Sequence, residues 1–174
     1  AYSGGGGGFG YGYGRPRWAM DYPEAEYYFT ALVDRLVDMD VFTKAGGRNP
    51  MYLDDPKLRD FPFLYIVEPG YMNLTDAEVR GLRGYLEAGG FLMMDDFWGS
   101  RETANVEYQL ARVLPGRPIV DLPLDHPLFH TVYDIEEIRQ VPNVSNGRRG
   151  GPTWERDGRV PLVRGIFDDE GRLM

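Results

Sequence analysis

The chain contains no cysteine among its 174 residues, which excludes disulfides, thiolate nucleophiles and cysteine-ligated metals together. Serine is rare, and none of Ser3, Ser100 and Ser145 stands in the G-x-S-x-G pattern of a nucleophilic serine. Apolar runs never approach the length of about 18 residues that crosses a bilayer. A basic leader with an apolar stretch is also missing, and a start at Ala1 is compatible with cleavage of a signal peptide, so we expect an exported protein.

Positive charge is scarce as well. The chain has 19 lysine and arginine residues against 27 aspartate and glutamate residues, for a net charge of −8. Binding to duplex nucleic acid requires a basic face, so we expect no nucleic-acid partner. The first 20 residues carry only Arg15 and Arg17 as charged residues, so the acidic excess lies in the rest of the chain. Two arginines contribute only about 1 kcal/mol each toward an anionic lipid surface, so any membrane contact of this segment should be weak.

Glycine and tyrosine dominate the first part of the chain, AYSGGGGGFGYGYG. This composition cannot bury enough surface to offset its backbone entropy, so residues 1–16 are predicted to be a flexible arm unless its own domain or a partner chain orders it. Tyrosine, tryptophan and arginine dominate the energetics of protein interfaces. The candidate partner-binding residues are therefore Phe9, Tyr11, Tyr13, Arg15, Arg17 and Trp18. Residues 17–174 are predicted to form one α/β domain.

Two continuous apolar runs, FLYIV at 63–67 and FLMM at 91–94, predict buried β-strands. Before them, apolar residues at helical spacing predict a helix over 24–38. A third strand is predicted at 119–122. The final segment, GIFDDEGRLM, predicts a glycine-containing hairpin that leads into another strand. Because a domain seldom ends at such a point, we expect the native chain to continue further.

Helix-end signals separate these strands. Thr75 and Glu78 form the capping-box pattern T-x-x-E, which predicts the start of a helix that the glycine pair at 89–90 ends. Ser100 is predicted to cap a further helix, which the Pro-Gly pair at 115–116 stops. Strand–helix–strand units with short loops imply right-handed crossovers, so a mainly parallel sheet covered by helices on both faces is predicted.

Acidic residues follow both apolar strands. The first strand runs into Glu68, and the second runs into Asp95 and Asp96. Ligands bind beyond the carboxyl ends of the strands in such sheets, so these carboxylates, with Arg101 close behind, are candidate ligand-binding residues. They could bind a divalent cation or supply a general acid. The alternative is that Asp95 and Asp96 only fix a tight turn and cap the following helix through backbone N–H groups.

His126 and His130 are the only histidines and lie four residues apart. Two histidines at this spacing can share a metal on a helix, but Pro127 disfavours helical geometry at His126, and the glutamate of a zinc-protease motif is missing. We therefore predict no metal site and no cofactor. His126 stays a candidate as a loop ligand or base beside the acidic residues, with a purely structural histidine as the alternative.

Four phrases of the sequence resemble the DUF4159 family, a bacterial family of uncharacterised and frequently exported or envelope-associated proteins. The phrases are RPRWAMDYPEAEYYFTALVDRL, DDPKLRDFPFLYIVEPG, LTDAEVRGLRGYLEAGGFLMMDDFWGSRE and IVDLPLDHPLFHTVYDIEEI. The resemblance covers residues 17–174 and implies an α/β three-layer sandwich with a mainly parallel sheet, of the flavodoxin-like and class I glutamine amidotransferase-like type. The L-T-x-x-E-V and D-H-P elements are also similar to the trehalose-utilisation (ThuA-like) relatives of that fold.

This chain departs from the resemblance at two points. Amidotransferase-like enzymes use a cysteine, and its absence here excludes that reaction. Members of the family also continue past the final Gly-Arg-Leu-Met with a further strand, which implies that a C-terminal segment is missing.

Two functions are compatible with these observations. The first is a non-catalytic accessory or structural subunit of a larger bacterial envelope or membrane-associated complex, respiratory or photosynthetic for example, which docks through its N-terminal arm. The alternative is an extracytoplasmic protein, placed in the periplasm, that binds or hydrolyses a small molecule or carbohydrate at the acidic crevice.

Overall fold

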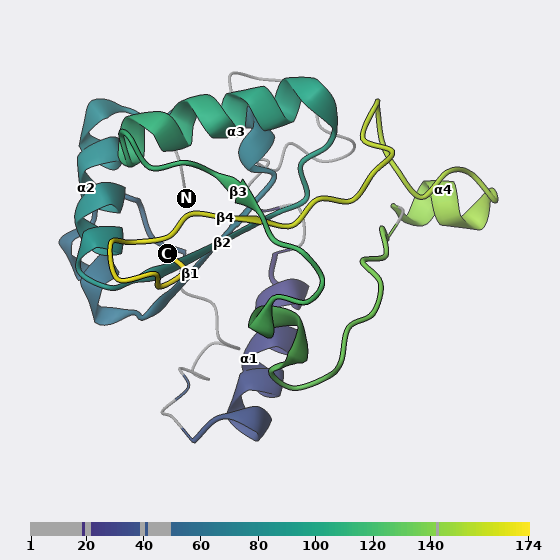
Figure 1. The fold of residues 1–174 in the computed structure, drawn as a ribbon, viewed down its shortest axis with the longest axis horizontal. Helices are drawn as coiled ribbons and strands as arrows, with labels where there is room; N and C mark the ends of the chain where they lie inside the picture. Colours follow the sequence, from purple (N-terminus) through teal and green to yellow (C-terminus); the bar gives the residue numbers. More distant parts are fainter. Residues whose placement is uncertain (1–18, 20–21, 39–40, 42–49, 142) are drawn as a thin grey trace. The chain divides into compact units, whose positions relative to one another are not determined.

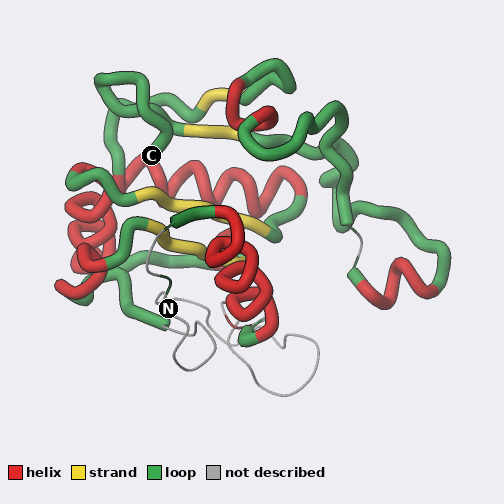
Figure 2. The backbone as a smooth tube through the Cα atoms, turned by 90° about the horizontal axis from the view of Figure 1, so that it is seen from below, coloured by secondary structure: helices red, strands yellow, loops and turns green. Residues whose placement is uncertain are grey.

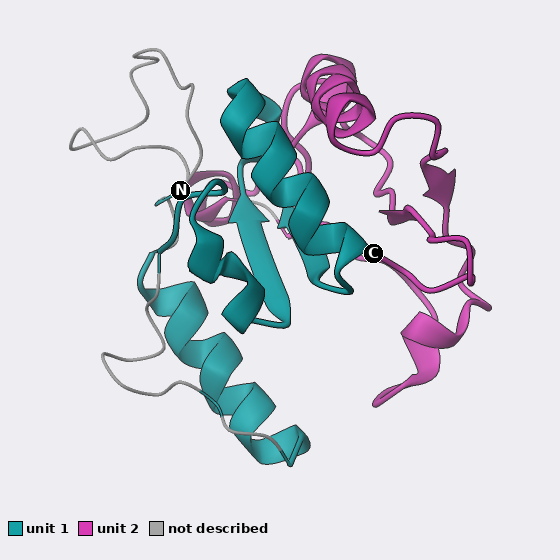
Figure 3. Ribbon diagram, turned by 90° about the vertical axis from the view of Figure 1, so that its left-hand side faces the viewer, with its two compact units in different colours: residues 1–96 teal, residues 97–174 magenta. Residues whose placement is uncertain are grey.

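The chain folds into two compact units, Ala1–Asp96 and Phe97–Met174 (Figure 3). The computed structural model describes residues 19, 22–38, 41, 50–141 and 143–174. The first unit holds a small parallel sheet with its connecting helix, and the second holds one long helix among mostly irregular chain (Figure 2). The predicted arm at 1–16 and its candidate contacts lie outside the described residues.

The centre of the first unit is a β-α-β arrangement (Figure 1). Strand β1 (Phe63–Val67) pairs in parallel with strand β2 (Phe91–Asp95), and helix α2 (Asp76–Glu87) connects them. Both strands were predicted from their apolar runs, and their parallel pairing is confirmed. The predicted burial is found only at Ile66 and Val67 of β1, and it is wrong for β2, where no residue is buried. The described sheet holds these two strands, so the structure shows a mixed helix–strand fold with a small parallel sheet.

The ends of α2 follow from two local signals. The Thr75 hydroxyl accepts the backbone N–H of Glu78 at 3.2 Å, and the Glu78 carboxylate accepts the backbone N–H of Thr75 at 2.8 Å, so the predicted capping box is confirmed. Gly89 ends the helix with a φ of 95°, where a side chain would be strained. Between these ends, burial raises the pKa of Tyr85 to about 12, and its hydroxyl donates to the Phe91 carbonyl at 3.1 Å.

Helix α1 (Glu24–Leu36) forms where the apolar spacing predicted it, and it ends two residues earlier than expected. It touches the sheet through aromatic stacking, since the rings of Phe29 and Phe63 lie 4.8 Å apart. None of the residues in α1 is buried. The apolar face that the sequence indicated is therefore largely exposed. Two short 3-10 helices, η3 (Pro56–Asp60) and η4 (Pro69–Tyr71), complete the described elements of this unit.

The second unit contains helix α3, two very short strands and two short helices. Their bounds are α3 (Gly99–Val113), β3 (Val120–Asp121), η5 (Pro127–His130), α4 (Val144–Arg148) and β4 (Arg164–Gly165). The predicted third strand forms as β3, but it pairs antiparallel with β4, so the expectation that it extends a parallel sheet is wrong. The physical reason is that the returning chain of the same unit supplies the partner, as Leu122 N–H donates to the Val163 carbonyl at 2.8 Å.

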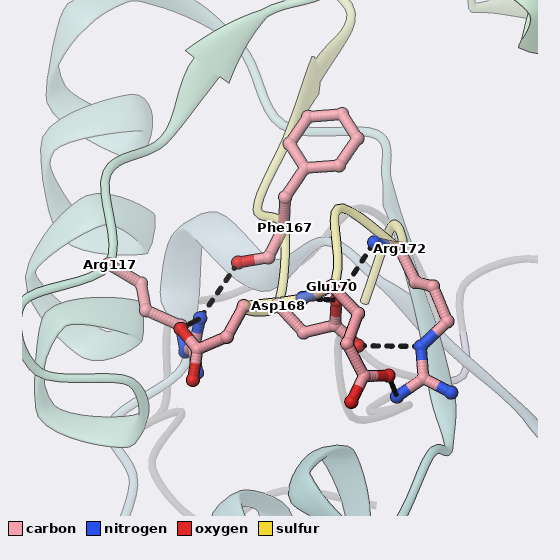
Figure 4. Close-up of polar contacts among 6 residues, drawn as sticks. Arg117, Phe167, Asp168, Glu170 and Arg172 are labelled. Atoms are coloured by element: carbon pink, nitrogen blue, oxygen red, sulfur yellow. Dashed lines mark hydrogen bonds and ion pairs between the residues drawn. The ribbon is translucent and has the colours of Figure 1, made fainter.

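The predicted C-terminal hairpin is confirmed by an antiparallel bridge between Phe167 and Leu173. An arginine from outside the hairpin braces it, because Arg117 donates to the Phe167 carbonyl at 3.0 Å (Figure 4). Within the hairpin, Arg172 Nε lies 2.7 Å from the Asp168 carboxylate. The backbone N–H of Arg172 also donates to that carboxylate, and together these bonds hold the pKa of Asp168 below its usual value.

Helix α4 includes the start of the glycine- and arginine-rich segment 146–152. The first part of that segment completes α4, because the Asn143 side chain caps the helix by accepting the N–H of Asn146 at 2.9 Å. Most of the segment is nevertheless exposed.

Candidate functional site

The carboxyl ends of β1 and β2 bring two of the predicted acidic residues together. Val67 pairs with Asp95 in the register of the sheet, and the N–H of Glu68 donates to the Asp95 carbonyl at 3.0 Å. Glu68 and Asp95 are therefore neighbours at one end of the sheet, with Asp96 next in the chain. The juxtaposition depends on the parallel register and on both strands having the same length.

The backbone is strained at this end of both strands. Glu68 has a φ of 50° and Asp96 a φ of 58°, both in the left-handed region that side chains other than glycine rarely adopt. Each such residue costs of the order of 1 kcal/mol, and residues of this kind gather at functional sites and tight turns. Two of them at adjacent strand ends mark this edge of the first unit as a candidate site.

The Asp95 carboxylate is engaged in local bonds. One oxygen accepts the N–H of Asp96 at 2.8 Å, and the other accepts the hydroxyl of Tyr65 at 3.3 Å. Bonds of this kind fix a tight turn. These bonds can hold the loops after β1 and β2 in place, and they leave the Asp95 carboxylate oxygens within reach of solvent.

The other two candidates, Arg101 and His126, belong to the second unit. Arg101 is exposed in the first turn of α3. His126 precedes η5 with extended backbone, as Pro127 led us to expect, and its Nδ1 accepts the N–H of Leu128 at 3.2 Å. Because the Nδ1 lone pair is used in this bond, the proton of the neutral ring sits on Nε2.

His130 has a different environment. Its Nδ1 lies 3.0 Å from an Asp134 carboxylate oxygen, and its Nε2 lies 2.9 Å from the Leu124 carbonyl. Both partners are acceptors, so only the doubly protonated imidazolium donates to both. The Asp134 bond, and next the Leu124 bond, raise the pKa of His130.

Sequence reasoning missed a cluster at the start of α3. Glu102 is 4% exposed, and its carboxylate accepts the Trp98 backbone N–H at 2.7 Å. Arg156 Nε lies 2.7 Å from the other oxygen of Glu102. Arg156 has a φ of 53°, so the ion pair with the buried Glu102 is made from a strained backbone position. Glu102 and Arg156 lie far apart in the chain, so no local sequence pattern indicates that they pair.

Asp157 completes this cluster and overturns the predicted cap. Helix α3 begins at Gly99, and Ser100 lies inside its first turn instead of capping it. The Asp157 carboxylate accepts the Ser100 backbone N–H at 3.0 Å from 57 residues away. Hydrogen bonds from Ser100, side chain first and then backbone, lower the pKa of Asp157. Gly99 has a φ of 73°, and a Cβ there would collide with the Asp157 carboxylate.

The second unit also contains an apolar groove of about 390 Å³. Three segments line it: 121–124, which continues β3, and 136–138 and 160–163. A smaller cavity of about 330 Å³ lies in the first unit, lined by residues that precede β1 and β2, such as Pro62 and Gly90. It therefore lies at the opposite end of the strands from Glu68.

The described residues contain no group of three or more histidine, aspartate or glutamate side chains that could hold a metal ion. Among the helices of this described part, none is long and apolar enough to span a membrane.

Comparison of the sequence with known proteins identifies its family. No curated protein matches the chain. Residues 11–174 match DUF4159, described as a domain of unknown function, and this match spans nearly the whole sequence. The chain therefore belongs to the DUF4159 family.

Proposed function

We propose that this chain is a non-catalytic accessory subunit of a larger bacterial envelope or membrane-associated assembly, placed outside the cytoplasm. In this proposal it docks through the N-terminal arm together with helix α1. A respiratory or photosynthetic complex is the kind of assembly that would hold such a subunit. The proposal also includes the finer fold relation, a flavodoxin-like or class I glutamine amidotransferase-like sandwich.

The observation that carries the proposal is the exposed apolar face of α1. Tyr27 is 54% exposed, Tyr28 is 70% exposed and Leu32 is 50% exposed. Leu36 continues the same side of the helix at 49%. A helix of a globular protein normally buries its apolar stripe, and a contiguous exposed stripe with aromatic residues is typical of a protein–protein interface.

The position of α1 in the chain strengthens this argument. The helix begins at Glu24, a few residues after the aromatic and arginine residues of the arm. A partner surface that binds the exposed face of α1 would therefore have the arm beside it. Combining two adjacent binding segments raises the affinity of each through its effective concentration.

The acidic residues that could support chemistry are used in structural bonds instead. Asp95 fixes its own turn, Glu102 pairs with Arg156, and Asp157 binds the first turn of α3. This pattern favours a binding role over acid–base catalysis.

The experiment that tests the proposal follows the full-length chain in the bacterium that makes it. Tyr28→Ser and Leu32→Ser, introduced together, remove the centre of the α1 face. We expect the wild-type chain to sediment with a large membrane-derived complex in a detergent gradient and the double variant to sediment as a free chain. Tyr52→Ser with Tyr108→Ser is the matched control, because both of these tyrosines are also more than 60% exposed.

Two outcomes would contradict the proposal. One is a wild-type chain that sediments alone, and the other is a double variant that stays with the complex as fully as the control. Deletion of residues 1–16 separates the two docking segments, since loss of assembly only after that deletion would assign the docking to the arm.

A second function is favoured by the strained strand ends at Glu68 and Asp96. In this alternative the loops after β1 and β2 bind a small molecule or a carbohydrate. Calorimetric titration with Ca²⁺, Mg²⁺ and a panel of sugars tests it, with Asp95→Asn as the variant expected to weaken binding. If no heat of binding were measured for any compound of the panel, this alternative would be refuted, and the docking proposal would be unaffected.

A further inference from the structure

The second unit carries a projecting lobe formed by residues 140, 141 and 143–158. The base of the lobe is closed by the Gln140 side chain, which donates to the Gly158 carbonyl at 2.8 Å. Further out, Asn143 donates to the Glu155 carboxylate at 2.5 Å. Helix α4, in the outer part of the lobe, lies away from β3 and β4 in both Figure 1 and Figure 2.

The lobe is fixed to the body of its unit by the cluster at the start of α3. Arg156 pairs with the buried Glu102, and Asp157 accepts the Ser100 N–H. Both bonds hold the returning leg of the lobe. The lobe is therefore positioned in advance, and a preorganised segment loses less conformational entropy when it binds than a free one.

The outer part of the lobe is basic and apolar. Residues 144–150 include Arg148 and Arg149 and contain no acidic residue. Both arginines are exposed, and no acidic side chain pairs with them within the described residues. Val144 is 67% exposed, and Val141 on the leading leg is 79% exposed. In a chain with a net charge of −8, this is a local reversal of sign.

The groove of about 390 Å³ has the opposite character. Its carboxylates are Asp121, Glu136 and Glu137. Asp121 pairs with Arg164 at 2.7 Å and Glu137 pairs with Arg139 at 2.9 Å, whereas no cation pairs with Glu136 within the described residues. Its apolar lining comes from leucine, isoleucine, valine and proline residues, of which Val160 and Leu162 are exposed. The walls at 136–138 and 160–163 are the two legs that lead into the lobe.

From this complementarity we propose that two copies of the chain form a dimer in which each copy places its lobe in the groove of the other. The arginines Arg148 and Arg149 of one copy face Glu136 and Glu137 of its partner, and Val144 enters the apolar groove. Because each copy gives one lobe and receives one, the contact repeats itself about a two-fold axis. Such an isologous interface closes at the dimer instead of growing into a fibre.

This dimer uses a different surface from the α1 face, so it stands or falls independently of the proposed docking function. Interacting charges at the rim of an interface are screened by salt. We therefore expect the dimer of the purified full-length chain to weaken as the NaCl concentration rises.

Sedimentation velocity over a concentration series, up to about 0.1 mM chain, tests the proposal. Variant one is Arg148→Glu with Arg149→Glu, and variant two is Glu136→Lys with Glu137→Lys. Each variant alone should weaken dimerisation at least about tenfold, because like charges then face each other across the interface. An equimolar mixture of the two variants should restore the dimer, because both exchanged contacts in the mixed dimer pair opposite charges.

The control has the same change in net charge as variant one: Arg35→Glu with Arg80→Glu alters two exposed arginines of the first unit. It should dimerise like the wild type, and circular dichroism should show that all variants are folded. A monomeric wild-type chain at the highest concentration would overturn the proposal. So would a dimer that both variants leave unchanged, or a mixture of the two variants that stays monomeric.

Discussion

Removal of the Glu102 carboxylate is the perturbation whose effect the structure defines best. Glu102→Ala removes the bonds that the Glu102 carboxylate makes with the Arg156 guanidinium and the Trp98 N–H at the start of α3. Hydrogen bonds to a charged group contribute about 1.5–3 kcal/mol each, and breaking a fully buried ion pair costs about 3–5 kcal/mol.

The exposure of the two partners sets the expected value. The Glu102 side chain is 5% exposed, but that of Arg156 is 43% exposed. Water can therefore solvate the Arg156 guanidinium once the Glu102 carboxylate is removed. We therefore expect Glu102→Ala to lower the free energy of unfolding by about 2–3 kcal/mol, at or below the lower limit of the range for fully buried pairs. Glu102→Gln keeps an acceptor for the Trp98 N–H and loses only the charge, so about 1 kcal/mol is expected.

Urea unfolding followed by tryptophan fluorescence measures this change, since Trp98 and Trp154 both lie in the second unit. Glu107→Ala is the matched control on the same helix. Glu107 also pairs with an arginine, Arg164, at 2.7 Å, but it is 48% exposed, so its loss should cost no more than about 1 kcal/mol. If the Glu102 and Glu107 variants lost the same stability, burial would not be what makes the Glu102 pair important.

Two further predictions concern the two units separately. His130 has a raised pKa, so its bonds to Asp134 and the Leu124 carbonyl are fully present below its unfolded pKa of 6.5 and are lost as the pH rises through the raised folded value. Stability of the second unit should therefore fall over this range, and His130→Gln should flatten the dependence measured by urea unfolding at several pH values; an unchanged slope would refute this account. In the first unit, a Cβ on Gly81 would collide with the Leu53 backbone carbonyl. Gly81→Ala should therefore lower the free energy of unfolding by about 1–3 kcal/mol, although alanine favours helices more than glycine does. A higher thermal unfolding midpoint in this variant would contradict the packing of Gly81 against Leu53.

Local signals determined the elements of the first unit. The capping box at Thr75 and Glu78 acts through bonds between residues three apart, so its sequence pattern and its structure carry the same information. Continuous apolar runs predicted where β1 and β2 lie, because apolar runs of this length favour strands. Burial did not follow from these runs: only Ile66 and Val67 are buried, and Met93 of β2 is 42% exposed. The position of Glu68 beside Asp95 followed from the parallel pairing of these strands.

The partners of the second unit were decided only by tertiary structure. Asp157 binds the first turn of α3 from 57 residues away, and it displaces Ser100 from the capping role that its local sequence indicated. β3 is two residues long and takes its antiparallel partner from the returning chain. A strand of that length is too short for its sequence periodicity to predict which strand it pairs with. The exposure of α1 has the same origin: spacing along a helix defines an apolar face, but only the surrounding chain decides whether anything covers it.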